Sequence, residues 1–185
     1  MRNFLFLLVF TVLVSGCTSV PSVTQRVNVD FKGYVYNDIT NQYVPQMTWA
    51  KISSHDEGGK VELVEVRVDR YGSGSNFLYI DLDNIDRHIS AVDKYLKWEI
   101  LANKNKELVD KSIDDIPSKY LSYDIEYSFF SGSEANHFLS VDHGTSFVTR
   151  GMYAIYFDRE NAMKYKEMLV KFKNGEYHLS GTIYQ

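Results

Sequence analysis

The chain has 185 residues, of which 44% are hydrophobic and 24% are charged, a composition typical of one globular domain with its own core. Its formal net charge is -4, and no dense run of Lys or Arg interrupts the acidic background, which argues against nucleic-acid binding. Cys17 is the only cysteine, so an intramolecular disulfide is excluded. Nothing in the composition implies a cofactor.

The first residues have the pattern of an export signal. Arg2 supplies a positive charge, and residues 4–14 form an apolar run that only Thr11 interrupts. A helix of these residues would reach about 16 Å, roughly half of a hydrocarbon core about 30 Å thick. The run therefore fits a signal peptide better than a membrane-spanning helix, and we exclude residues 1–16 from the fold.

The next four residues, Val14-Ser15-Gly16-Cys17, resemble the lipobox of bacterial lipoproteins, in which an aliphatic residue and two small residues precede an obligatory cysteine. The resemblance implies that signal peptidase II cuts between Gly16 and Cys17. It also implies diacylglycerol on the Cys17 sulfur and an acyl chain on the new amino terminus, so the expected partner of Cys17 is a lipid bilayer. The alternatives are a conventional signal peptide with an unrelated cysteine, or an uncleaved membrane helix.

Thr18 bears on the destination within the cell envelope. In the enterobacterial sorting pattern that this segment resembles, Asp at this position favours the inner membrane, so Thr18 favours the outer membrane facing the periplasm. In a Gram-positive cell the same signal would leave the domain outside the plasma membrane. The resemblance covers residues 1–18. We expect residues 17–25 to form a lipidated tether and residues 26–185 to form a single domain.

Hydrophobic periodicity predicts strands and helices in the remainder of the chain. Alternation with period two predicts strands near residues 26–32, 47–52, 64–68, 78–82, 121–129, 138–141 and 147–157. Helical spacing predicts one helix over residues 85–100 and another that ends before Asn174-Gly175. Asp83 and Asp158 are the expected N-caps of these helices. Tyr177, Leu179 and Ile183 favour a last strand.

These elements predict an α+β fold with an antiparallel sheet of about six strands and two helices packed on one face. The order strand, Asp, helix occurs twice, at residues 77–101 and 153–172, which would fit a weak internal duplication. Few identities relate the two segments, so independent capping of each helix by Asp explains the repeat more simply.

Three carboxylates in six residues form the tightest acidic cluster, Asp81, Asp83 and Asp86. An EF-hand would need an oxygen ligand at Ile85 and glycine in place of Asp86, so the calcium-loop pattern is not completed. Capping of the following helix and a favourable interaction with its dipole explain these acids better than a metal site does.

His137, Asp142 and His143 could hold zinc if a turn brought them together, although a solvated hairpin fits the same residues. Ser131 or Ser133 could complete a Ser-His-Asp constellation with them. No nucleophile elbow of the G-x-S-x-G type supports that constellation. We therefore predict no catalytic, metal or cofactor-binding residues here.

Aromatic residues make up 15% of the chain, with 14 Tyr and 11 Phe. Tyr34 and Tyr36 stand opposite the predicted core face of the first strand, and Tyr156 stands opposite Ile155, so these rings are expected to face outward or against a second layer. Tyrosine-rich surfaces bind peptides, glycans or other proteins. We interpret the outward rings as a partner surface.

Three functions follow from these patterns. The expected anchor and the incomplete catalytic sets favour a noncatalytic envelope lipoprotein that binds another protein or an envelope component. One alternative is a periplasmic inhibitor or immunity protein that masks a hydrolase, because a small acidic lipoprotein suits that work electrostatically. The other is a membrane-tethered hydrolase that uses Ser133 and His143.

Overall fold

The computed structural model describes residues 21–70, 74–143 and 153–180, and the predicted α+β class is confirmed there. The signal peptide, the lipobox and Cys17 lie outside the described residues. The elements in chain order are β1 Val23–Asn28, β2 Tyr34–Asn37, β3 Gln42–Pro45, β4 Thr48–Ser54, β5 Leu63–Asp69, β6 Ser75–Asp81, α1 Ile85–Asn105, β7 Asp110–Ile116, β8 Ile125–Ser133, β9 Asn136–Asp142, β10 Ile155–Phe157 and α2 Arg159–Lys173.

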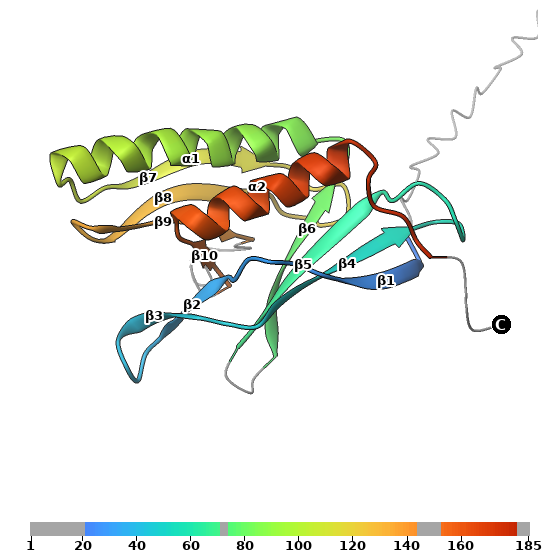
Figure 1. Cartoon of the computed structure of the whole chain (residues 1–185), viewed down its shortest axis with the longest axis horizontal. Helices are drawn as coiled ribbons and strands as arrows, with labels where there is room; N and C mark the ends of the chain where they lie inside the picture. Colours follow the sequence, from blue (N-terminus) through green and yellow to red (C-terminus); the bar gives the residue numbers. More distant parts are fainter. Residues whose placement is uncertain (1–20, 71–73, 144–152, 181–185) are drawn as a thin grey trace, which may run out of the picture.

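The larger sheet has six antiparallel strands in the order β3-β2-β10-β9-β8-β7. Both helices pack side by side on one of its faces, as the sequence predicts (Figure 1). The β2–β3 hairpin forms one edge and projects away from the helices (Figure 1). The other face of this sheet is therefore free of helices.

A second antiparallel sheet, in the order β1-β4-β5-β6, was not predicted as a separate unit, because periodicity does not show to which sheet a strand belongs. Its first strand begins at Val23, so the last three residues of the expected tether pair with β4. The chain then crosses to the larger sheet at Gly33. A Cβ on Gly33 would lie 2.5 Å from Val68 and 2.8 Å from Ile155, so only glycine fits this crossing.

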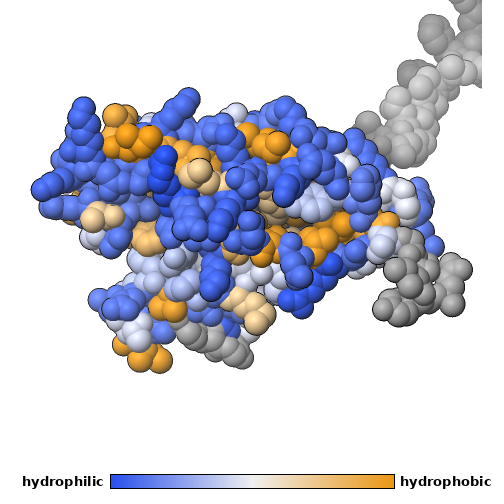
Figure 2. Space-filling view, in the orientation of Figure 1, coloured by the Kyte–Doolittle hydropathy of each residue, from blue (hydrophilic) through white to orange (hydrophobic). Residues whose placement is uncertain are grey.

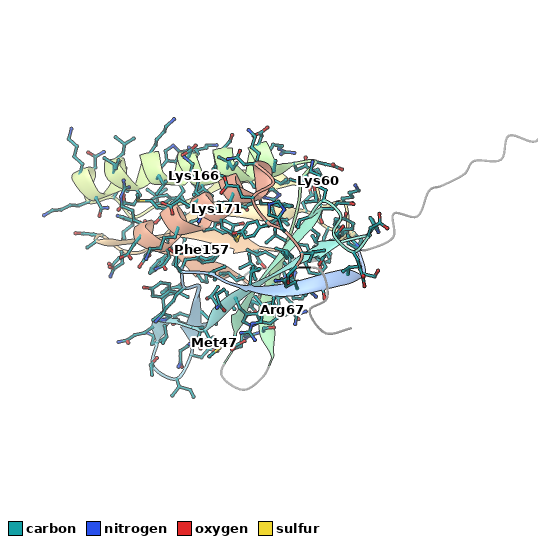
Figure 3. All side chains as sticks on the ribbon, turned by 45° about the vertical axis from the view of Figure 1, so that its right-hand side comes forward. Met47, Lys60, Arg67, Phe157, Lys166 and Lys171 are labelled. Atoms are coloured by element: carbon teal, nitrogen blue, oxygen red, sulfur yellow. The ribbon has the colours of Figure 1, made fainter. Side chains whose placement is uncertain are left out.

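Helix α2 follows the sequence prediction closely. The Asp158 carboxylate caps it by accepting a 2.9 Å hydrogen bond from the backbone N–H of Asn161. The predicted apolar stripe is fully buried: Ala162, Tyr165, Leu169 and Phe172. Phe157, at the end of β10, lies below α2 and stacks on Tyr165 at 4.9 Å between ring centroids (Figure 3).

Helix α1 differs from the prediction at its start. Asn84, not Asp83, occupies the N-cap position, and its side chain makes no capping hydrogen bond. Instead the Asp81 carboxylate, at the end of β6, accepts a 3.2 Å hydrogen bond from the backbone N–H of Asn84. The strand runs up to Asp81, so three residues are needed to turn the chain before the helix. The expected cap is therefore wrong, because the N-cap position lies one residue later than predicted.

Several strand boundaries also differ. β7 was missed because a bulge between Ser112 and Asp114 breaks its alternation. β8 begins at Ile125, four residues later than predicted. Residues 176–180 form no strand, although Leu179 is buried, and Ile183 lies outside the described residues. The predicted strand over residues 147–157 is described only at its end, as β10.

The exposed side of the helices is mostly hydrophilic, with hydrophobic residues in separate spots (Figure 2). The exposed apolar side chains of the helices are Ile100, Leu101 and Met163. None of the helices in residues 21–70, 74–143 and 153–180 is long and apolar enough to cross a membrane.

Candidate functional site

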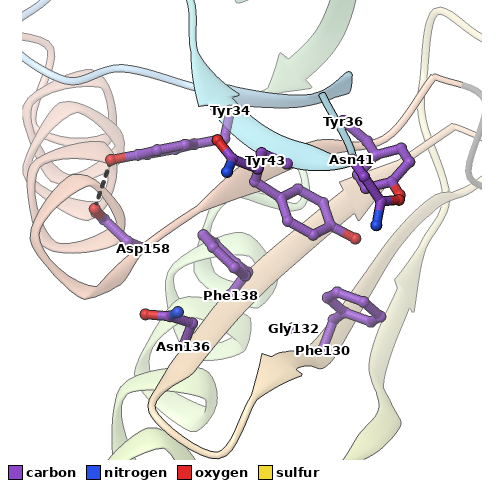
Figure 4. Close-up of a pocket in the computed structure, with 10 residues that line it drawn as sticks. Tyr34, Tyr36, Asn41, Tyr43, Phe130, Gly132, Asn136, Phe138 and Asp158 are labelled. Atoms are coloured by element: carbon purple, nitrogen blue, oxygen red, sulfur yellow. Dashed lines mark hydrogen bonds between the residues drawn. The ribbon is translucent and has the colours of Figure 1, made fainter. Parts of the chain in front are cut away.

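A cavity of about 700 Å³ opens on the face of the larger sheet that the helices leave free (Figure 4). We call it the aromatic groove. Strands β2, β3, β8 and β9 and the cap of α2 supply its walls. Its lining consists of Tyr34, Tyr36, Asn41, Gln42, Tyr43, Phe130, Gly132, Asn136, Phe138 and Asp158.

Strand alternation places the rings in this groove. On β8 and β9, the buried residues Phe129 and Leu139 face the helices, so their neighbours Phe130 and Phe138 face the groove. On β2, Tyr34 and Tyr36 flank the buried Val35 in the same way. Tyr34 and Tyr36 therefore face away from the helices, as predicted, but the predicted reason is wrong, because both lie on β2 of the larger sheet and not on the strand that contains Val27.

Tyr43 lies at the centre of the ring cluster because the β2–β3 hairpin brings it over the sheet (Figure 4). Its ring centroid lies 4.7 Å from that of Tyr156, 4.9 Å from Phe138, 5.1 Å from Tyr36 and 5.6 Å from Phe130. Burial is the main reason why the pKa of Tyr43 is raised, and the neighbouring Tyr156 raises this pKa further. The Tyr43 hydroxyl therefore stays protonated at neutral pH and can donate a hydrogen bond.

Asp158 ties one end of the groove to helix α2. The Tyr34 hydroxyl donates a 2.9 Å hydrogen bond to Oδ2 of Asp158, while Oδ1 of Asp158 caps the helix (Figure 4). Burial and this hydrogen bond raise the pKa of Tyr34 to about 12. At the other end, the Tyr36 hydroxyl donates to the side-chain oxygen of Asn41. Both outer tyrosines are thus oriented by a hydrogen bond.

A second cavity of about 510 Å³ adjoins the groove and shares Phe130 with it. We call it the polar cavity. Three serines form a row across it, because Ser128 pairs with Ser112 on one side and with Ser140 on the other. The remaining lining residues are Asp110, Lys111, Glu126, Asp142 and Tyr156.

Charged side chains also line the two cavities. They are the carboxylates of Asp158, Asp110, Glu126 and Asp142 and the ammonium group of Lys111. The Lys111 Nζ lies 5.1 Å from the centre of the Trp98 ring. The site therefore presents aromatic rings, amides, hydroxyls and charged groups.

The Ser, His and Asp candidates do not assemble into one site. Ser131 and His137 do meet, with 2.8 Å between Oγ and Nδ1. Asp142 lies five residues from His137 on the same strand, roughly 17 Å away, so it cannot orient that ring. The Ser133 Oγ accepts from the backbone N–H of Ala135.

The solvated hairpin expected for His137, Asp142 and His143 is wrong, because β9 lies inside the sheet and all three residues are buried. The His143 ring stacks with the rings of Phe77, Tyr123 and Tyr153. Within the described ranges, no three His, Cys, Asp or Glu side chains are grouped to hold a metal ion.

The three carboxylates near the start of α1 have separate partners. Asp81 accepts from the backbone N–H groups of Asn84 and Lys119. Asp83 lies 3.4 Å from the Lys119 ammonium, and Asp86 forms a 2.6 Å ion pair with Lys173. These contacts hold surrounding segments in place and give the acids structural roles.

Sequence reasoning missed two buried polar groups. His88 Nδ1 lies 2.9 Å from the Tyr127 hydroxyl, which lies 2.9 Å from the Tyr165 hydroxyl beneath the helices. Glu65, on the smaller sheet, is buried and forms ion pairs of 2.5 Å with both Lys51 and Arg67. Both groups connect neighbouring elements and lie outside the aromatic groove and the polar cavity.

The fold and the site define an α+β domain with an open, aromatic-lined groove on the free face of its larger sheet. No family model, no curated protein and no solved structure matches this chain.

Proposed function

We propose that the protein is a lipid-anchored component of a bacterial cell envelope whose domain binds an envelope ligand in the aromatic groove without transforming it. The single observation that carries the binding role is the groove itself. Its rings line a cavity of about 700 Å³, whereas large aromatic side chains in a folded domain are ordinarily covered by other elements.

The chemistry of the groove supports binding more than catalysis. Its tyrosine hydroxyls keep their protons, because the pKa values of Tyr34 and Tyr43 are raised, and the Asp158 carboxylate is occupied by its helix and by Tyr34. The Ser131–His137 pair is a poor catalytic dyad, because the His137 ring is buried and no carboxylate orients it among the described residues.

The proposed anchor would keep the domain close to the membrane. Five residues separate Cys17 from Val23, and a fully extended segment of that length spans at most about 18 Å. Because β1 begins at the end of the domain opposite the β2–β3 hairpin (Figure 1), the groove would lie a domain's length from this tether, still within the envelope near the bilayer. An envelope polymer is immobile near the bilayer, so this location suits a polymer better than a metabolite that diffuses.

Photo-crosslinking in intact cells tests the binding role. A photoreactive phenylalanine analogue replaces Tyr36 or Gln42 at the groove, or Lys97 on the exposed side of α1 as the control. We expect light-dependent adducts from positions 36 and 42 and none from position 97. Equal adducts at all three positions, or none at any, would contradict a ligand in the groove. A hydrolase as the sole adduct would replace this proposal with the inhibitor function.

A further inference from the structure

We infer that the ligand of the aromatic groove is a saccharide chain, and that it extends from the groove into the polar cavity. This inference rests on the proposed function and adds to it the chemical class of the ligand.

The two cavities adjoin one another on the sheet, and we call the two together the path. Phe130 lines both of them, and Tyr156, which lines the polar cavity, packs 4.7 Å from Tyr43 and 5.7 Å from Phe130 between ring centroids. The path runs from the edge strand β3 to the opposite edge strand β7. Six strands have five spacings of about 4.8 Å, so the path is about 24 Å long. A chain of several units fits such a path better than a single small molecule.

The lining matches the two kinds of surface that a sugar ring presents. The carbon–hydrogen faces of a pyranose are apolar and pack on the negative faces of aromatic rings, here those of Tyr36, Tyr43 and Phe138. Its hydroxyl groups lie around the rim and need both donors and acceptors. The side chains that offer both are the amides of Asn41, Gln42 and Asn136 and the hydroxyls of Ser112, Ser128 and Ser140.

An extended peptide fits this path less well. Peptides that bind to sheets add a strand at an edge, where unpaired backbone N–H and C=O groups recognise them. The path instead crosses the face of the sheet, where the backbone groups of β8, β9 and β10 already pair with their neighbours. An occupant of the face must therefore be recognised by side chains, through its own hydroxyl groups and apolar faces.

Titration calorimetry of the full-length protein in detergent tests the inference. The probes are N-acetylglucosamine tetramer, glucosamine tetramer, cellotetraose, tetragalacturonate and octaproline. We expect at least one of the four saccharides to bind and octaproline not to bind. Tyr43→Ala should weaken that binding by about tenfold, and Tyr36→Ala, at the more exposed rim, should weaken it less. Tyr79→Ala on β6, with a tyrosine outside the path, is the matched control.

The outcomes separate this inference from the proposed function. The inference is overturned if no saccharide binds in a manner that depends on Tyr43, or if octaproline binds in place of the saccharides. When the crosslinks from position 36 persist while every saccharide fails, the groove still binds a ligand and only the ligand class is wrong. When both experiments fail, the proposed function falls as well. Thermal unfolding of Tyr43→Ala and Tyr36→Ala shows that loss of binding is not loss of fold.

Discussion

Cys17→Ala is expected to abolish incorporation of a palmitate analogue into the protein. The expected lipidation needs the Cys17 sulfur as its nucleophile, and the chain offers no other thiol. Each buried methylene contributes about 0.8 kcal/mol, so two or three acyl chains hold a protein at a bilayer almost irreversibly, whereas an unmodified chain has no such hold. The expected change is therefore all or none.

Intact mass of the protein extracted from membranes supplies the second measurement. The wild-type mass should equal residues 17–185 with acyl additions, whereas Cys17→Ala should show neither the additions nor cleavage before residue 17. Ser19→Ala, two residues further on, should keep both features and is the control. A free Cys17 thiol in the wild-type protein would contradict the proposed lipid anchor.

A second large effect is expected on acidification. Between pH 6.5 and about 4, His88 should lower the free energy of unfolding by about 3 kcal/mol. Burial and, to a smaller extent, the neighbouring Arg87 lower the pKa of His88 from 6.5 to about 4, while Asp114 on β7 acts in the opposite direction. The other groups at its ring, Tyr127 and Tyr165, stay neutral because burial raises their pKa values.

The direction follows from proton binding in the two states. Between these pH values the unfolded chain protonates this histidine and the folded chain does not, so acid favours unfolding. Stability from His88 is fully present above pH 6.5 and is lost as the pH falls toward 4. Burial also lowers the pKa of His143, which acts in the same direction, so the contribution of His88 must be isolated by substitution.

Urea denaturation at several pH values, on wild type and His88→Gln, isolates that contribution. The variant should lose about 3 kcal/mol less than wild type between pH 6.5 and 4, whereas His55→Gln, with an exposed ring, should follow wild type. If the free energy of unfolding changed equally with pH in wild type and His88→Gln, His88 would not be buried in its neutral form.

The sequence predicted those elements in which one face meets the core without interruption. Helix α2 is the clearest case, because Asp158, the buried stripe through Tyr165 and the Gly175 stop all follow local rules. Strand β5 was recognised for the same reason, since Val64, Val66 and Val68 alternate with polar residues. Strand β7 was missed because its bulge puts Ile113 and Ile116 out of the period-two pattern.

The groove could be predicted only in part. The outward direction of Tyr156 was predicted from its alternation with Ile155, whereas that of Tyr34 and Tyr36 was predicted from a first strand that in fact ends at Asn28. Tyr43 carries no such signal, because its place depends on the β2–β3 hairpin folding over strands that lie about ninety residues further along the chain. The same long-range pairing places the serine row, since strand register is a property of the sheet and not of any single strand.

Cosedimentation with insoluble cell-wall polymer tests the central claim most directly, namely that the aromatic groove holds an envelope polymer. The full-length protein in detergent is mixed with the purified polymer and centrifuged, with Tyr43→Ala as the groove variant and Lys97→Ala as the control on α1. We predict that wild type and Lys97→Ala enter the pellet and that Tyr43→Ala, still folded, stays in the supernatant. Equal sedimentation of all three proteins, or of none, would contradict the claim.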